Sequence, residues 1–113
     1  MQSATTTLAQ ALALLPPETV TGRRYAEPLT HGTMRLGLYA PRQFDPQQPH
    51  EQDELYVVMR GTGTFLHGDE RTTFQPGDVL FVAAGVTHRF EDFSDDFVVW
   101  VVFWGPKGGE AEQ

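Results

Sequence analysis

One stretch of the chain decides its fold, QPHEQDELYVVMRG over residues 48–61. It enters a predicted strand over 54–60, and His50 stands four residues before Glu54. Side chains alternate between the two faces of a strand, so this even separation places both residues on one face if no bulge intervenes. An ionised carboxylate on a buried face needs a cation or several donors to offset its desolvation. Glu54 is therefore the strongest single indication of a site.

A second stretch further along the chain supplies a third polar residue. Residues 77–88 read GDVLFVAAGVTH, which places His88 at the start of an otherwise apolar strand. Two neutral imidazoles and one carboxylate suit a first-row divalent metal, and non-haem iron oxygenases use this ligand set. Manganese, nickel, zinc and copper accept the same ligands. The alternative is that His50 and His88 are hydrogen-bonded polar residues of a site without metal.

The chain after residue 19 has the texture of an all-β protein. Short β-like runs are separated by turn residues such as Gly68–Asp69, which suits a two-residue hairpin, and 75–78 (QPGD), which suits a type II turn. Strands are predicted over residues 22–28, 34–40, 54–60, 63–67, 71–75, 79–83, 87–91 and 97–104. Many short strands with no helix between them predict a sandwich or a closed barrel.

The two stretches resemble the conserved motifs of the cupin superfamily. Residues 50–61 (His-x3-Glu-x6-Gly) resemble the second half of its first motif, and residues 77–88 (Gly-x5-Ala-x-Gly-x2-His) resemble most of its second. The resemblance implies a cupin-type double-stranded β-helix, or jelly-roll barrel, over roughly residues 20–104. It further implies a dimer with one divalent metal held in the mouth of the barrel by His50, Glu54 and His88.

Three positions depart from the cupin motifs. Ala83 stands where the family has Pro and Asp92 where it has Asn, and both positions concern the turn more than the chemistry. Gln48 stands where the first metal-binding His is expected. Its amide oxygen makes Gln48 a candidate fourth ligand, but a carboxamide is a poorer ligand than imidazole for a borderline metal. The expected site binds metal less tightly than a three-histidine site, or has an additional open position.

Both ends of the chain carry apolar segments that need a partner. Residues 3–15 predict a short helix, capped by Ser3 or one of Thr5–Thr7 and stopped by Pro16. The strand at 97–104 (FVVWVVFW) is apolar on both faces, so its second face requires the helix, a second sheet or another subunit. We therefore expect a homodimer. The predicted organisation is a helix and arm over 1–18, a barrel over 19–104 and a flexible tail over 105–113.

Composition narrows the function. The net charge is −7 and the longest basic run is Arg23–Arg24, which argues against a nucleic-acid partner and against an anionic membrane surface. No cysteine is present, so there is no disulfide framework, thiolate metal site or cysteine nucleophile. These features favour a cytoplasmic protein that binds small molecules.

The predicted pocket combines apolar walls with one polar corner. Tyr56 shares the inward face of Glu54, and Phe90 shares that of His88. Arg35 has two alternatives: on the cavity side it predicts an anionic substrate such as a carboxylate, and otherwise it lies on the outer face. The leading hypothesis is a metal-binding cupin that binds or transforms a small organic molecule, with dioxygenase, isomerase and lyase chemistry suggested by the fold alone. The alternative is a metal-free binding or sensing module that is not an enzyme.

Overall fold

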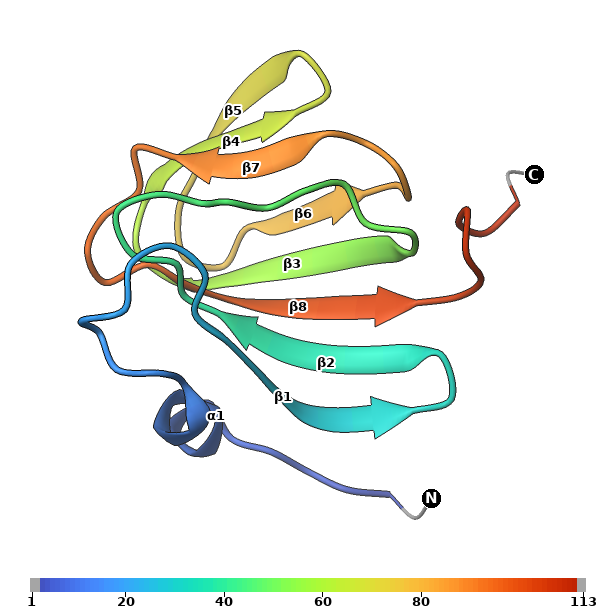
Figure 1. The fold of residues 1–113 in the computed structure, drawn as a ribbon, viewed down its shortest axis with the longest axis horizontal. Coiled ribbons are helices and arrows are strands. Elements are labelled where there is room, and N and C mark those ends of the chain that lie inside the picture. Colours follow the sequence, from blue (N-terminus) through green and yellow to red (C-terminus); the bar gives the residue numbers. More distant parts are fainter. Residues whose placement is uncertain (1–2, 112–113) are drawn as a thin grey trace.

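Eight antiparallel strands and one short helix make up the regular structure of this chain, in a computed structural model that describes residues 3–111 (Figure 1). The elements are α1 (Leu8–Leu14), β1 (Tyr25–His31), β2 (Met34–Tyr39), β3 (Asp53–Arg60), β4 (Gly63–His67), β5 (Glu70–Phe74), β6 (Val79–Val82), β7 (His88–Glu91) and β8 (Val98–Trp104). All predicted strands are present, and only the first is displaced along the chain by more than one residue. No helix in this part of the chain is long and apolar enough to cross a membrane.

The strands form two sheets that face each other. One sheet has the order β1-β2-β8-β3-β6, and the other has the order β5-β4-β7. In the larger sheet β8 lies between β2 and β3, with Tyr39 opposite Val99 on one side and Tyr56 opposite Val101 on the other. This is the predicted jelly-roll architecture. The barrel stays open, because no ladder joins the two sheets within residues 3–111.

The segment between β2 and β3 runs along the open side of the molecule, below β7 in Figure 1. Pro41, Pro46 and Pro49 remove backbone donors from this segment, which disfavours a regular ladder. A side chain makes the connection instead, because the carboxylate of Asp45 accepts a hydrogen bond of 2.8 Å from the backbone N–H of Phe90 in β7. The segment thus closes over the core without becoming a strand.

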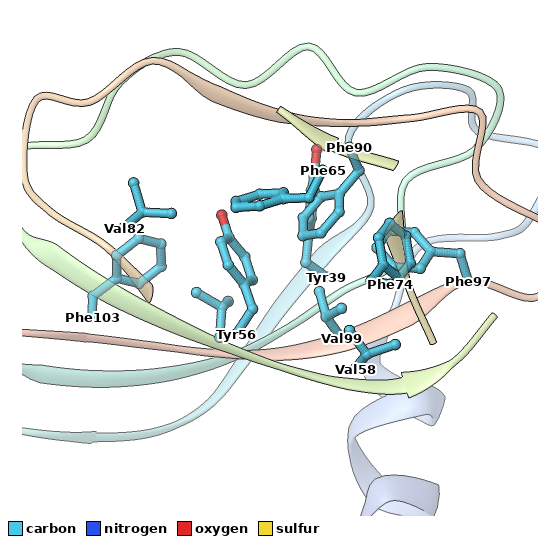
Figure 2. Packing of buried hydrophobic residues seen from close by; sticks show 11 residues of the cluster. Tyr39, Tyr56, Val58, Phe65, Phe74, Val82, Phe90, Phe97, Val99 and Phe103 are labelled. Carbon is cyan, nitrogen blue, oxygen red and sulfur yellow. The ribbon is translucent and has the colours of Figure 1, made fainter. Parts of the chain in front are cut away.

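Aromatic side chains fill the space between the sheets (Figure 2). The ring of Phe90 lies at the centre, with the rings of Tyr56, Phe65, Phe74 and Phe97 at centroid distances of 4.7–5.5 Å. Each of these residues is less than 5 % exposed. Rings at such separations pack edge-to-face or offset, which gives a dense and rigid core. The candidate site lies directly against this core, because the ring of His88 packs beside Tyr56 and Phe65.

The predicted hairpin at Gly68–Asp69 and the predicted turn at 75–78 are both present. Gly68, with φ of 63°, connects β4 to β5 together with Asp69. Gly77 has φ of 93° at the third position of the turn after β5, and the N–H of Asp78 donates to the carbonyl of Gln75 over 3.1 Å. A positive φ at that position is what a type II turn requires and what glycine adopts without strain.

The N-terminal helix is shorter than predicted. It begins after Thr7, whose hydroxyl accepts from the N–H of Gln10 while the Gln10 side chain accepts from the Thr7 N–H. Thr7, one of the predicted caps, is thus the N-cap of a capping box that starts the helix. Ala11 is fully buried against Leu38 and Val98 on the outer face of the larger sheet.

Both faces of β8 are apolar, as predicted, but they are covered differently. The inner face belongs to the core between the sheets. On the outer face Val98 is buried beneath α1, whereas Val102 and Trp104 lie beyond the helix and are half-buried. The helix therefore covers only part of the outer face.

The described part of the C-terminal tail, 105–111, lies against the beginning of β3. The N–H of Gly108 donates to the carbonyl of Glu51 over 2.8 Å, and the N–H of Glu110 donates to Asp53 over 2.9 Å. The predicted flexibility of the tail and the predicted division at 18 and 104 stay predictions. Residues 1–2 and 112–113 lie outside the described part of the chain.

Candidate metal centre

His50, Glu54 and His88 lie together between the sheets, each offering a ligand atom within 4.8 Å of the others. Glu54 lies in β3 and His88 opens β7, while His50 belongs to the segment before β3. The approach of His50 therefore comes from a loop and not from strand alternation, which was the basis of the prediction. The N–H of Gly85 holds this loop by donating to the carbonyl of His50 over 2.8 Å.

The cluster holds two buried polar atoms that lack a regular hydrogen bond. Nε2 of His88 lies 2.5 Å from Oε1 of Glu54, and Oε2 of Glu54 lies 3.7 Å from Nε2 of His50. Within residues 3–111 neither His88 Nε2 nor Glu54 Oε2 makes a hydrogen bond of regular geometry, although His88 Nε2 and Glu54 Oε1 form a close ion pair. Glu54 is 0 % exposed and His88 is 2 % exposed. An unsatisfied buried polar group costs about 1–3 kcal/mol, and a cation bound between these atoms would remove that cost.

The imidazole of His88 is oriented as a ligand. Its Nδ1 lies 2.9 Å from the carbonyl oxygen of Val86. Because a carbonyl only accepts, the neutral ring carries its proton on Nδ1 and directs the lone pair of Nε2 toward Glu54. Metal-binding histidines are held in the same way by their second ring nitrogen. The donor set therefore fits a divalent transition metal.

The protonation of the two histidines is set by burial and by Glu54. Burial lowers the pKa of His50, more than the nearby carboxylate raises it, so this ring is neutral at pH 7. Burial also disfavours the charged form of His88, but the contact with Glu54 outweighs it and raises the pKa of His88. A ring nitrogen and a carboxylate that attract a shared proton also attract a metal cation in its place.

The carboxamide that reaches the cluster belongs to Gln47. Its Oε1 lies 3.1 Å from Nε2 of His50 and accepts a hydrogen bond of 2.9 Å from the hydroxyl of Tyr56. Gln48 is exposed and lines the neighbouring cavity. Coordination by Gln48 stays a prediction, and Gln47 is a second candidate that sequence reasoning missed. Because this segment has no regular period, the direction of its side chains could not be read from the sequence.

Asp45 anchors Gln47, and it was also missed. Its carboxylate accepts from the Gln47 side chain over 2.7 Å and from the Gln47 backbone N–H over 3.2 Å. It also accepts from the Tyr39 hydroxyl and from the N–H of Phe90. One buried carboxylate thus connects the irregular segment to both sheets. The only sequence signal for it was an Asp between apolar and proline residues.

A cavity of about 340 Å³ opens next to the cluster. Its lining residues are Arg23, Tyr25, Arg35, Tyr39, Pro46, Gln47, Gln48, His50, Tyr56, Val101 and Phe103. His50 and Tyr56 are shared by the cavity wall and the cluster. Two of the three predicted pocket residues, Tyr56 and Arg35, line this cavity, whereas Phe90 is 1 % exposed and belongs to the core beneath it. A volume of this size suits a small organic molecule.

The other two histidines and Asp53 lie away from the cluster. His31 ends β1 and is exposed. His67 stands beside the Gly68–Asp69 turn, where a solvent-facing loop residue is the expectation from sequence. It instead ends β4 half-buried, and its ring stacks on Phe65 at 5.6 Å. Asp53 points to the opposite face from Glu54, as strand alternation requires, and accepts from the N–H groups of Ala84 and Glu110.

Comparison with known proteins agrees with this architecture. The cupin domain profile matches residues 35–104. The chain is 41 % identical over 85 residues to an uncharacterised protein of Streptomyces coelicolor, covering 74 % of this chain and 81 % of that protein. It is 32 % identical over 56 residues to the HTH-type transcriptional activator RhaS of Mannheimia succiniciproducens, covering 50 % of this chain and 21 % of that protein.

A solved structure extends the likeness to nearly the whole chain. An RmlC-like cupin from Shewanella frigidimarina superposes with a TM-score of 0.70 over 91 % of both chains, at 11 % identity. That identity supports a shared fold and no shared activity. Two motif blocks, a jelly roll of two facing sheets and a family profile spanning more than half of the sequence lead to one conclusion: this chain belongs to the cupin family.

Proposed function

We propose that this protein is a metal-binding cupin that binds or transforms a small organic molecule in the cavity beside His50. The observation that carries the proposal is the convergence of three buried or half-buried ligand atoms within 4.8 Å, where Nε2 of His88 and Oε2 of Glu54 make no regular hydrogen bond. Evolved interiors rarely leave such groups without a partner unless a ligand or ion completes them. His50, Glu54 and His88 would hold one divalent transition metal, of the group Fe, Mn, Ni, Zn and Cu.

The chemistry would be divided between the metal and the residues around it. A bound metal supplies a Lewis acid or a redox centre next to the cavity. His88 keeps its Nδ1 proton on the Val86 carbonyl and so keeps one lone pair toward the site. The single hydroxyl proton of Tyr56 lies within reach of two acceptors, Oε1 of Gln47 at 2.9 Å and Oε1 of Glu54 at 3.1 Å. Burial raises the pKa of Tyr56 well above the ordinary value, so it remains a neutral donor. Dioxygenase, isomerase and lyase reactions are the classes that the fold suggests.

The metal can be tested on protein purified without chelators, by mass-spectrometric elemental analysis. We expect bound divalent metal in the wild-type protein and its loss in Glu54→Gln, which keeps the shape of the side chain but removes the charge. Adding metal at about 100 times its Kd should stabilise the wild-type protein by about 2.7 kcal/mol, and Glu54→Gln should not respond. Glu70→Gln, on the exposed strand β5, is the matched control.

Two results would count against the metal. One is wild-type protein that contains none and whose thermal stability does not change with Fe, Mn, Ni, Zn or Cu. The other is Glu54→Gln behaving as the wild type in both measurements. Either result favours a metal-free site.

The second candidate is a metal-free cupin that binds or senses a small ligand without turnover. Gln48 at the position of a family histidine favours it, and so does the partial match to a transcriptional activator. In that case the cavity would still bind its ligand, while Glu54→Gln would leave ligand binding unchanged and neither protein would be stabilised by added metal. The metal measurement therefore separates the two candidates.

We further propose that the protein acts as a homodimer in the cytoplasm. The support for a dimer is the apolar outer face of β8 beyond α1, where Val102 and Trp104 are only half-buried. The support for the compartment is the absence of cysteine, which suits a reducing environment.

A further inference from the structure

The charge of the cavity is opposite to the charge of the chain. The protein has a net charge of −7, with fifteen acidic residues against eight Lys and Arg. Yet two of those eight cations, Arg23 and Arg35, line the cavity beside His50, Glu54 and His88. Within residues 3–111 the lining of this cavity includes no carboxylate. An acidic protein that concentrates positive charge in one concave site favours an anion there.

Arg35 is aimed at the cavity by its place in the sheet. It pairs with Phe103 across β2 and β8, and Phe103 belongs to the inner face of β8. The guanidinium lies over the ring of Phe103, with its central carbon 4.5 Å from the ring centroid. The ring of His50 packs against the same Phe103 at 5.1 Å. Phe103 therefore contacts both Arg35 and His50, which line the same cavity.

The guanidinium is oriented by two neighbours, and its salt bridge with Glu27 is long and partly exposed. Its Nη2 donates to the side chain of Gln52 over 3.0 Å, and its Nη1 lies 3.6 Å from Glu27, with 42 % of the Arg35 side chain exposed. A guanidinium has five N–H donors, and Gln52 accepts only one hydrogen bond from it. Glu27 also accepts a hydrogen bond from the Tyr25 hydroxyl over 3.1 Å, so its charge is shared between two neighbours. Donors thus remain free for a bidentate partner on the cavity side.

Arg23 adds a second positive charge at the same cavity. Its guanidinium lies 4.8 Å from the centroid of the Tyr25 ring. The Tyr25 ring in turn lies over Gly37, where a Cβ atom would come within 2.2 Å of it. Glycine at this position of β2 therefore allows the Tyr25 ring to lie close to the sheet. The same ring contacts Arg23 at the cavity wall.

We propose that the small molecule bound in the cavity is an organic anion whose carboxylate pairs with the guanidinium of Arg35. This rests on the proposed function, in which the cavity beside His50 holds the ligand, and it names the class of that ligand. The planar fork of arginine matches a carboxylate in two parallel hydrogen bonds. The apolar surface of Phe103, Val101 and Tyr56 would hold the carbon part of the ligand.

The test compares a carboxylate with its neutral amide. Benzoate and benzamide have the same shape, and butyrate and butyramide form a second pair without a ring. Binding is measured by nuclear magnetic resonance titration at millimolar ligand, on the protein as purified and after metal loading. We expect both carboxylates to bind more tightly than their amides, and Arg35→Met to weaken carboxylate binding roughly 10- to 100-fold while leaving amide binding unchanged.

Two further variants keep the test independent of folding. Arg35→Lys keeps the charge but loses the fork, so its affinity should lie between those of the wild type and Arg35→Met. Arg60→Met removes an exposed arginine at the end of β3, outside the cavity, and should bind as the wild type does. Each variant is checked for bound metal, which Arg35→Met should retain.

The outcomes separate this inference from the metal proposal. Carboxylate binding that depends on Arg35 in a protein without metal would uphold the inference and overturn the metal. Bound metal together with equal binding of carboxylates and amides, or with no binding of either, would overturn the inference alone. Binding of inorganic phosphate that depends on Arg35 and is tighter than the binding of both carboxylates would overturn the assignment to a carboxylate.

Discussion

Asp45 is the residue that connects the irregular segment between β2 and β3 to the rest of the site. Its carboxylate accepts four hydrogen bonds, from Tyr39, Phe90 and both the backbone and side chain of Gln47. Gln47 in turn contacts His50 and Tyr56. No contact joins Asp45 to the cluster directly, so it acts as a positioning residue. Its effect on the metal is exerted through Gln47 and the loop that carries His50.

Asp45→Asn should therefore lower both stability and metal retention. The amide keeps the size of the side chain but replaces one acceptor oxygen with a donor, so at least one of the four donors loses its partner. We expect the free energy of unfolding to fall by roughly 1.5–3 kcal/mol, as measured by urea denaturation. Asp95→Asn, on an exposed turn, is the control. An Asp45→Asn protein as stable as the control would show that the four contacts contribute nothing net.

At the scale of elements, Asp53 joins three segments that are distant in sequence. It stands at the start of β3 and accepts from the N–H of Ala84, in the loop between β6 and β7, and from the N–H of Glu110, in the tail. A Cβ on Gly109 would approach Asp53 to 2.7 Å, so glycine allows the tail to lie this close. The loop that Asp53 holds leads directly into His88. The tail is thereby connected to an element of the site.

This junction predicts a dependence of stability on pH. The two backbone hydrogen bonds lower the pKa of Asp53 below its ordinary value of 3.8. A group with a lowered folded-state pKa contributes stability that is complete above its ordinary pKa and is lost as the pH falls through the folded value. Asp53→Asn should therefore be less stable than the wild type near neutral pH, and the difference should shrink with acidification below about pH 4.

The measurement is urea denaturation of both proteins across that pH range. Asp69→Asn, in the exposed turn between β4 and β5, controls for the general effect of removing a negative charge. A difference between wild type and Asp53→Asn that stays constant down to the most acid point would contradict a role for the ionised carboxylate.

At the scale of the whole molecule, the outer face of the larger sheet is the feature that one chain leaves incomplete. The side chains on this face beyond α1 are Leu36, Leu55, Val57, Val79, Phe81, Val102 and Trp104, from four adjacent strands. Phe81 is 56 % exposed and Val79 is 58 % exposed. The rings of Phe81 and Trp104 lie 6.2 Å apart, so the patch is continuous across β6, β3 and β8. Contiguous apolar patches of this kind usually mark an interface.

We expect this patch to pair with the same patch of a second copy. Phe81→Lys places a charge on the patch, at the edge strand β6, and a twofold interface built on the patch would bury two such charges. At micromolar concentration the wild-type protein should elute as a dimer from a sizing column with light scattering, and Phe81→Lys as a folded monomer. Val20→Lys, on a partly exposed residue outside the sheet, should leave the dimer intact. A wild-type protein that is monomeric at these concentrations would contradict the prediction.

The direction of Arg35 shows where sequence reasoning reached its limit. In β2 the residues Met34, Leu36 and Leu38 alternate with Arg35, Gly37 and Tyr39. Ordinary patterning turns the apolar set inward, yet in this sheet the set with Arg35 faces the cavity and Leu38 is buried beneath α1. Because both faces of the larger sheet are covered or apolar, hydrophobic alternation does not tell which face is inside. Only the register with β8 decided it.

The cluster of His50, Glu54 and His88 could be predicted from the sequence, and its surroundings could not. His50, Glu54 and His88 followed from two motif blocks, and the strands and turns followed from periodicity, glycine and proline, because these are local preferences of the backbone. The partners of the cluster, Gln47 and Asp45, belong to a segment that prolines keep out of the ladder, so no period fixes their directions. The positive cavity and the exposed outer face likewise arise from contacts between distant segments. Packing of the two sheets, and not local sequence, brings these side chains together.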